Sequence, residues 1–242
     1  MRTIRIYQPG IDACGQLIEL SAAASQHVGV VLRMQPDEPL TLFCGDNREF
    51  LSTIETVHKK KVFVRINSVH HANRESPRKI HLAQAISKGE RMELVVQKAV
   101  ELGIASITPL LTEHCVVRLD ADRLAKKQAQ WQNIAISACE QSGRNQLPII
   151  FPACSLGTFL QHCQATTKLI LYPDATKSWR DYLFPDGDIA LLIGPEGGLS
   201  GDEVNQAMLA LFQPLCLGPR ILRTETAAIV ALGVLQAVAG DL

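Results

Sequence analysis

The stretch ALLIGPEGG, residues 190–198, joins an apolar run directly to a glycine-rich loop, and the helix-capping sequence SGDE follows at residues 200–203. The apolar residues predict a buried strand over residues 189–193, and the capping box predicts a helix to about residue 212. Ligands of open α/β sheets bind outside the carboxyl ends of the strands. Because glycine lets the backbone approach a ligand closely, residues 194–199 (the first loop) predict a ligand site in an α/β domain.

The chemistry of the first loop argues against the common phosphate-binding motifs. The loop lacks the GK[ST] ending of a P-loop, and it is not GxGxxG. The carboxylate of Glu196 would repel a pyrophosphate, whereas it suits a ligand with cationic character. The sulfonium and amino groups of S-adenosylmethionine fit that description. Taken alone, the loop could also be an ordinary strand-to-helix turn.

A second glycine-rich stretch, LGPRILRTETA at residues 217–227, makes the ligand site more specific. It follows a short predicted strand at residues 215–217 and precedes a predicted helix at residues 224–239. Thr224 is expected to be the N-cap of that helix. Capping does not account for the neighbouring Arg223 or for a repeated Gly-Pro pair. Residues 217–226 (the second loop) and the first loop therefore predict one ligand pocket at the ends of two strands.

The chain from residue 80 onward alternates strands with helices, which predicts an α/β fold with a mostly parallel, buried sheet. Before residue 70 the pattern is of short strands around one helix, which suggests a small barrel. The polar residues 70–79, including His70 and His71, read as a solvated linker. The expected domains are residues 1–72 and 73–242. The strands are expected at residues 4–7, 16–20, 40–44, 49–57, 61–69, 80–86, 104–111 and 168–172, and the further helices at 21–34, 88–102 and 120–142.

Composition excludes several classes of protein. The 242 residues are 47% hydrophobic and 20% charged, with zero formal net charge, as in an ordinary globular protein. No apolar run approaches the roughly 18 residues of a membrane span, and the N-terminus lacks the apolar segment of a signal peptide, so we expect a cytoplasmic protein. The seven cysteines are odd in number and widely spaced, without a CxxC, which favours reduced thiols over a zinc site or a disulfide framework.

The motifs of both loops resemble those of a known family. IGPEGGLS (193–200) and LGPRILRTETA (217–227) are similar to the C-terminal motifs of SPOUT-class RNA methyltransferases, and more narrowly of the RsmE family, the 16S rRNA (uracil-N3)-methyltransferases. The resemblance extends in family order over nearly the whole chain. The other matching stretches are HVGVVLRM (27–34), KGERMELVVQKAVELG (88–103), ITPL (107–110) and ACEQSGRNQLP (138–148).

This resemblance implies an N-terminal PUA-like barrel followed by a SPOUT domain that ends in a trefoil knot. It also implies a homodimer that uses S-adenosylmethionine, without metal or membrane, on 16S rRNA or the small ribosomal subunit. The residues implied to bind the cofactor are Leu171, Ile193, Gly194, Glu196, Gly197, Leu217, Gly218, Ile221, Leu222 and Thr226.

Methylation at N3 of uridine removes an imide proton and leaves negative charge on the flanking oxygens, which a positioned cation would stabilise. Arg223 is the expected catalytic cation, and Glu140 or Glu225 is a candidate general base. An ion pair between Arg223 and either Glu225 or Glu196 is the structural alternative. The candidates for RNA contact are Arg2, Arg5, Arg33, Lys88 and Arg144.

Two other functions stay open at this level. The chain could be a SPOUT methyltransferase that acts on another nucleotide or on a ribose 2′-hydroxyl. It could also be an RNA-binding ribosome-assembly factor without activity, although both Gly-Pro loops and Arg223 are intact.

Overall fold

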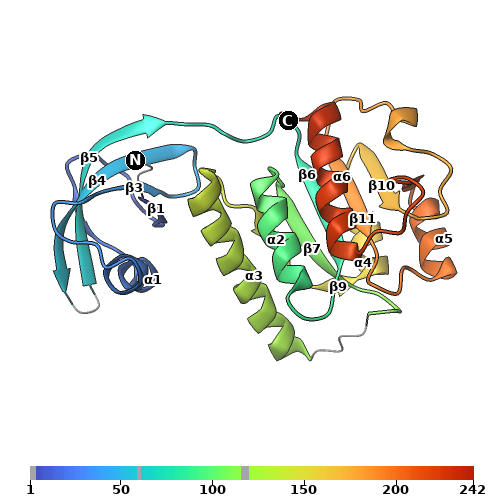
Figure 1. Cartoon of the computed structure of the whole chain (residues 1–242), viewed down its shortest axis with the longest axis horizontal. Coiled ribbons are helices and arrows are strands. Elements are labelled where there is room, and N and C mark those ends of the chain that lie inside the picture. Colours follow the sequence, from blue (N-terminus) through green and yellow to red (C-terminus); the bar gives the residue numbers. More distant parts are fainter. Residues whose placement is uncertain (1–3, 59–60, 116–119) are drawn as a thin grey trace. The chain divides into compact units, whose positions relative to one another are not determined.

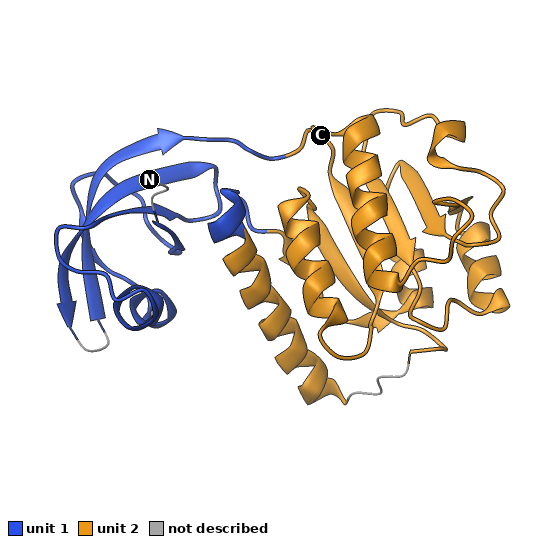
Figure 2. Ribbon diagram, in the orientation of Figure 1, with its two compact units in different colours: residues 1–75, 139–147 blue, residues 76–138, 148–242 orange. Residues whose placement is uncertain are grey.

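A computed structural model describes residues 4–58, 61–115 and 120–242, and the chain forms two compact units (Figure 2). The first unit comprises residues 1–75 and 139–147, and the second comprises residues 76–138 and 148–242. The sequence assigned residues 139–147 to the second domain, whereas their contacts group them with the first unit. The division into domains at residues 72 and 73 stays a prediction.

The second unit is built on a parallel sheet with the strand order β12-β10-β11-β6-β7-β8 (Figure 1). Every neighbouring pair is parallel, and β9 also pairs with β7, which confirms the predicted sheet. All five residues of β11 are buried, because helices cover both faces. The strands are β6 (Ile80–Ala85), β7 (Ser106–Leu111), β8 (Ile149–Ile150), β9 (Cys154–Ser155), β10 (Thr167–Leu171), β11 (Ile189–Ile193) and β12 (Gln213–Leu215).

Helices pack on the two faces of this sheet. Helices α2 and α6 contact each other, and α6 also contacts β11 (Figure 1). On the other face, Phe159 of α4 and Val204 of α5 share a core with Ala190 and Leu192 of β11. The helices are α2 (Arg91–Glu101), α3 (Ala121–Ser142), α4 (Leu156–His162), α5 (Gly201–Leu209) and α6 (Thr224–Ala239), with a 3₁₀ turn η2 (Trp179–Asp181).

Element boundaries differ from the sequence expectation where the backbone turns sharply. Helix α2 begins at Arg91 rather than at Lys88, because Gly89 takes a left-handed φ of 69° that a helix cannot contain. Helix α5 ends at Leu209 rather than at Phe212, since Leu211 has a φ of 69°. Strand β12 accordingly starts at Gln213, two residues earlier than predicted.

The first unit contains a five-stranded sheet with the order β1-β3-β4-β5-β2. Strands β1 and β3 pair in parallel, and the other pairs are antiparallel. A single apolar cluster, with Ile6, Leu42 and Phe50 among its buried members, forms the core. The strands are β1 (Ile4–Tyr7), β2 (Leu17–Glu19), β3 (Pro39–Phe43), β4 (Arg48–His58) and β5 (Lys61–His71).

Two expectations for the first unit need correction. The single helix expected at residues 21–34 is a short α1 (Ala22–Gln26), capped by Ser21, that continues as a π-helix η1 (His27–Val31). His70 and His71 do not lie in a linker, because they pair with Glu49 and Arg48 of β4. Pairing with the long strand β4 therefore extends β5 through His71, despite the polar composition of residues 70–79.

The described residues were also compared with what a membrane span, a metal site or a disulfide would require. Within the described ranges, no helix is long and apolar enough to cross a membrane. The described residues also contain no group of three or more His, Cys, Asp or Glu placed to hold a metal ion. All seven cysteines are free thiols, and burial raises the pKa of Cys139 to about 12.

Candidate functional site

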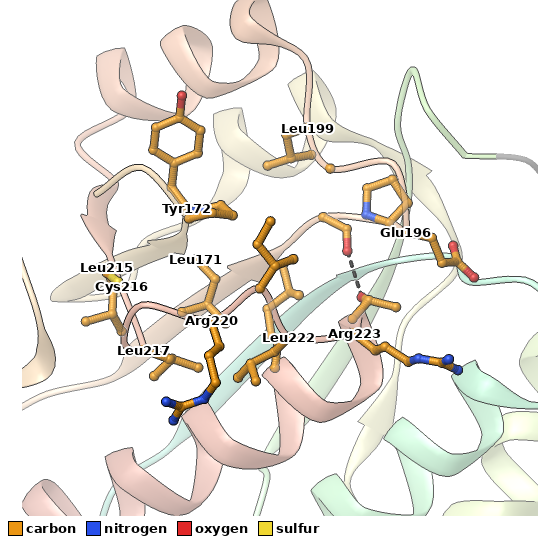
Figure 3. A pocket seen from close by; sticks show the side chains of 18 of the residues that line it. Leu171, Tyr172, Glu196, Leu199, Leu215, Cys216, Leu217, Arg220, Leu222 and Arg223 are labelled. Atoms are coloured by element: carbon orange, nitrogen blue, oxygen red, sulfur yellow. Dashed lines mark hydrogen bonds between the residues drawn. The ribbon is translucent and has the colours of Figure 1, made fainter. Parts of the chain in front are cut away.

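Three neighbouring strands end at one edge of the parallel sheet and define the site. Strand β10 lies between β11 and β12, so Leu171, Ile193 and Leu215 end side by side. The first loop continues β11 and the second loop follows β12. Together they enclose a pocket of about 630 Å³, a volume typical of a cofactor site (Figure 3).

Most residues expected to bind a cofactor line this pocket. They are Leu171, Ile193, Gly194, Glu196, Gly197, Leu217, Gly218, Ile221 and Leu222. Thr226 is exposed on the first turn of α6 and is not among the lining residues. The pocket is also lined by Arg91, Arg220 and the segment Tyr172, Pro173 and Asp174, which were not among the residues expected to bind the cofactor. The segment follows directly after β10, so its place at a strand end was the available signal.

The first loop folds tightly upon itself, which explains its glycines. A Cβ on Gly194 would lie 3.1 Å from both the backbone nitrogen and Cγ of Leu199. A Cβ on Gly197 would lie 3.1 Å from Cβ of His114. Side chains at these positions would therefore push the loop open.

Thr224 joins the two loops instead of capping α6. The helix begins at Thr224, and the residue in the cap position, Arg223, makes no side-chain capping bond. The Thr224 hydroxyl donates to the carbonyl of Gly194 at 2.8 Å and accepts from Nε2 of Gln84 at 3.0 Å. Both Thr224 and Gln84 are buried. The predicted N-cap was wrong, because the hydroxyl serves a contact between segments 30 residues apart.

A group of charged side chains lies beside the first loop. Oε1 of Glu196 accepts from the backbone N–H of Lys88 at 3.0 Å and from Nη1 of Arg91 at 2.7 Å. Nε of Arg91 is 3.9 Å from Oε1 of Glu225. Burial acts to raise the pKa of Glu196, but hydrogen bonds from its own and the Lys88 backbone amides and from Arg91 outweigh it, so this pKa lies below its usual value.

Arg223 lines the pocket and is exposed. Within the described part of the chain it makes neither a hydrogen bond nor an ion pair, so the expected alternative of a pair with Glu196 or Glu225 is not observed. Figure 3 shows Arg223 and Glu196 on the same side of the pocket. The N-terminus of α6 adds positive potential there, since its first N–H groups point out of the helix.

The two candidate bases occupy different places. Glu140 belongs to the first unit, where it accepts from the backbone N–H of Tyr7 at 3.0 Å and lies 3.7 Å from Nδ1 of His27. Burial raises its pKa despite these partners. Glu140 is not among the lining residues of the pocket, and its role as a base stays a prediction. Glu225 is not a lining residue either, but Oε2 of its carboxylate is buried and has no hydrogen-bond partner among the described residues.

The candidates for RNA contact differ in their exposure and in their ion pairs. Arg33 and Lys88 are exposed. Arg5 is half-buried and pairs with Glu49 at 2.5 Å, and Arg144 is only 5% exposed and paired with Glu75. Both guanidinium groups are already paired with a carboxylate, and their contact with RNA stays a prediction. Arg2 lies outside the described residues.

A parallel α/β unit whose strand ends carry two Gly-Pro loops around one pocket, joined to a small β unit, is the organisation of an RNA methyltransferase. Residues 74–236 match the family described as RNA methyltransferase domain, and residues 20–67 match the RNA methyltransferase PUA domain. The chain is 39% identical to the ribosomal RNA small subunit methyltransferase E of Buchnera aphidicola subsp. Schizaphis graminum, over 100% of this chain and 98% of that protein. It therefore belongs to the ribosomal RNA small subunit methyltransferase E family.

Other relatives and solved structures agree with this assignment. The enzyme of the same name from Bacillus subtilis is 34% identical over 87% of this chain and 86% of its own length. A Neisseria gonorrhoeae member solved with S-adenosylmethionine is 38% identical, with a TM-score of 0.93 and full coverage of both chains. A Legionella pneumophila methyltransferase solved with the same cofactor is 61% identical, with a TM-score of 0.98 and full coverage of both chains.

Proposed function

We propose that this protein transfers a methyl group from S-adenosylmethionine to N3 of a specific uridine in 16S rRNA of the small ribosomal subunit. The observation that carries the proposal is the pocket at the three strand ends, with the unpaired Arg223 in its wall. Family membership supports the rRNA substrate. The cofactor found in the two solved relatives supports S-adenosylmethionine.

The residues of the pocket fit this cofactor. The wall is mostly backbone and apolar side chain, as an adenine and a ribose require, and added Cβ atoms at Gly194 and Gly197 would distort the loop that forms it. Backbone groups of Leu171, Leu217 and Leu222 would hold these moieties. When bound, the cofactor supplies an electrophilic methyl group on a sulfonium.

At the uracil, the guanidinium of Arg223 would stabilise the charge that develops on the oxygens beside N3 as the imide proton leaves. The N-terminus of α6 acts in the same direction. Of the two candidate bases, Glu225 lies closer in sequence to Arg223, and one of its carboxylate oxygens has no hydrogen-bond partner among the described residues. Much of the rate would come from alignment of N3 with the methyl group.

Recognition of RNA would involve the first domain, with the exposed Arg33, and Lys88 on the methyltransferase side. The target uridine must be unstacked to enter the pocket. We also propose the trefoil knot of the SPOUT class and a homodimer. Helix α6 carries no charged residue after Glu225, and Val230 and Val238 on it are 39% and 36% exposed, which supports a partner on this helix.

The test is mass spectrometry of nucleosides from 16S rRNA of a deletion strain that carries the wild-type protein or Arg223→Ala. The wild-type protein should restore N3-methyluridine, and the variant should restore a small fraction of it. N3-methyluridine that persists in the deletion strain would overturn the uridine assignment. Restoration of a different methylated nucleoside would favour the alternative SPOUT activity. The remaining alternative is an RNA-binding ribosome-assembly factor without activity. Calorimetry tests it, because such a factor would not bind S-adenosylmethionine even at millimolar concentration.

A further inference from the structure

The charged residues that line the pocket are Arg91, Asp174, Glu196, Arg220 and Arg223, and Glu225 lies beside Arg91. Four of them concern the first loop and the start of α6: Glu196 and Glu225 carry carboxylates, and Arg91 and Arg223 carry guanidinium groups. Arg91 contacts both acids, through Nη1 to Glu196 at 2.7 Å and through Nε to Glu225 at 3.9 Å. Arg223 contacts neither. Two carboxylates thus share one guanidinium, although a second is present in the same wall.

The position of Arg91 explains this pairing. It is the first residue of α2, directly after the turn at Gly89, and α2 packs against α6. The guanidinium group of Arg91 can therefore contact the first loop and the start of α6 at the same time. The Lys88 backbone N–H from the same turn binds the same oxygen of Glu196 as Arg91 does. A lysine would offer one charge centre and could not span both acids in this way.

From these contacts we propose that Arg91 is a positioning residue, which holds Glu196 and Glu225 away from Arg223 and so leaves Arg223 free to meet the anionic uracil. This inference rests on the proposed function. Without Arg91, Arg223 is the guanidinium of the pocket wall on the side where Glu196 lies, because Arg220 lies on the side of Leu217 (Figure 3). An ion pair there would cancel the charge that the reaction needs.

The first experiment measures steady-state methylation of small ribosomal subunits from the deletion strain by the full-length protein. Arg91→Gln should lower kcat about tenfold or more, while the Kd for S-adenosylmethionine changes by less than about threefold. Arg91→Lys should give an intermediate kcat, and it preserves a cation if the glutamine variant folds poorly. An unchanged kcat in both variants, or a loss confined to cofactor affinity, would overturn the proposal.

The second experiment tests whether the Glu196 carboxylate, once released from Arg91, causes the loss of kcat. In the Arg91→Gln background, Glu196→Gln removes the acid that would turn toward Arg223, and kcat should recover by about threefold or more. A double variant as slow as Arg91→Gln or slower would mean that Arg91 merely supports the loop, and it would overturn the proposal. Arg123→Gln is the matched control, because Arg123 is exposed on α3 and pairs with Asp120 at 3.5 Å.

Arg223→Ala separates this inference from the function on which it rests. Normal turnover by Arg223→Ala would remove the catalytic role of Arg223 and the inference with it. A slow Arg223→Ala enzyme beside a normal Arg91→Gln enzyme would leave the proposed function in place and overturn the inference alone.

Discussion

Hydrogen bonds of single buried residues hold the two loops of the pocket together. Thr224 is the clearest case, because its hydroxyl both donates to Gly194 and accepts from Gln84. Oε1 of Gln84 is buried without a partner, so the amide group depends on its Nε2 contacts with Thr224 and the carbonyl of Ala85. The pocket is thus sensitive to side chains that do not need to touch the ligand.

Thr224→Val should lower both stability and cofactor affinity. The substitution keeps the shape of the side chain but leaves the Gly194 carbonyl and one Gln84 N–H unpaired, which costs about 1–3 kcal/mol. Urea denaturation and calorimetry with S-adenosylmethionine measure the two effects. Thr224→Ser keeps the hydroxyl and should stay close to wild type. Equal behaviour of the valine and serine variants would contradict a role for this hydrogen bond.

Gly194→Ala should weaken cofactor binding by about tenfold or more, because the new Cβ would meet the backbone of Leu199 at 3.1 Å and push the first loop open. Gly201→Ala is the matched control, since no atom lies within 4 Å of its added Cβ. That control should bind the cofactor normally and be slightly more stable, as alanine favours the helix. If both variants bound equally well, the tight first loop would not matter for the ligand.

At the scale of elements, β6 carries the titratable residue His81 at the contact between the sheet and α4. His81 shares a 2.6 Å hydrogen bond with Ser106 of β7 and stacks on Phe159 of α4 at 5.5 Å. Its Nε2 is buried without a partner among the described residues. Burial lowers the pKa of His81 from 6.5 to about 4. The packing of α4 on the sheet therefore requires the neutral imidazole.

His81→Phe should reduce the pH dependence of stability. Between pH 6.5 and about 4 the unfolded chain protonates His81 while the folded protein does not, so this stabilisation is present above pH 6.5 and is lost as the pH falls. The loss is on the order of 2–3 kcal/mol. Denaturant unfolding at pH 7 and pH 4 should show a smaller decrease for the variant than for wild type. The exposed His162, changed to Asn, serves as control, and equal decreases in wild type and His81→Phe would refute the prediction.

At the scale of the whole molecule, residues 139–147 group with the first unit, although they begin with the last four residues of α3, a helix that starts in the second unit. Nε of Arg144 donates to Glu75 at 3.1 Å, and Nδ2 of Asn145 donates to the carbonyl of Ala72 at 2.6 Å. Arg74 donates to the carbonyl of Gly143 at 3.0 Å. The chain thus passes between the two units more than once.

Glu75→Gln should lower the free energy of unfolding by about 3 kcal/mol, because it leaves the nearly buried Arg144 charge without its carboxylate. Glu55→Gln breaks the exposed pair with Arg65 in the same unit and should change the free energy of unfolding much less, because solvent screens that pair. Urea denaturation of both variants tests the difference. Similar costs for the two would show that the Arg144 pair behaves like a surface ion pair.

The local sequence pattern predicted an element correctly where the structure of that segment depends mainly on its own residues. The apolar run of β11 and the Ala-rich stretch of α6 have the predicted bounds, since burial and helix propensity act within each segment. Nine of the ten residues expected to bind the cofactor line the pocket, because they continue strands whose ends meet at one edge. Their role as ligands stays a prediction.

The sequence by itself determined the parallel α/β unit, the two loops at its strand ends and the family. Only the tertiary structure decided which charges meet. It paired Arg91 with Glu196, Thr224 with Gly194, Arg5 with Glu49, and Arg144 with Glu75. The physical reason is that periodicity records which face of an element is apolar, whereas the partner of a polar side chain depends on segments that are distant in the chain.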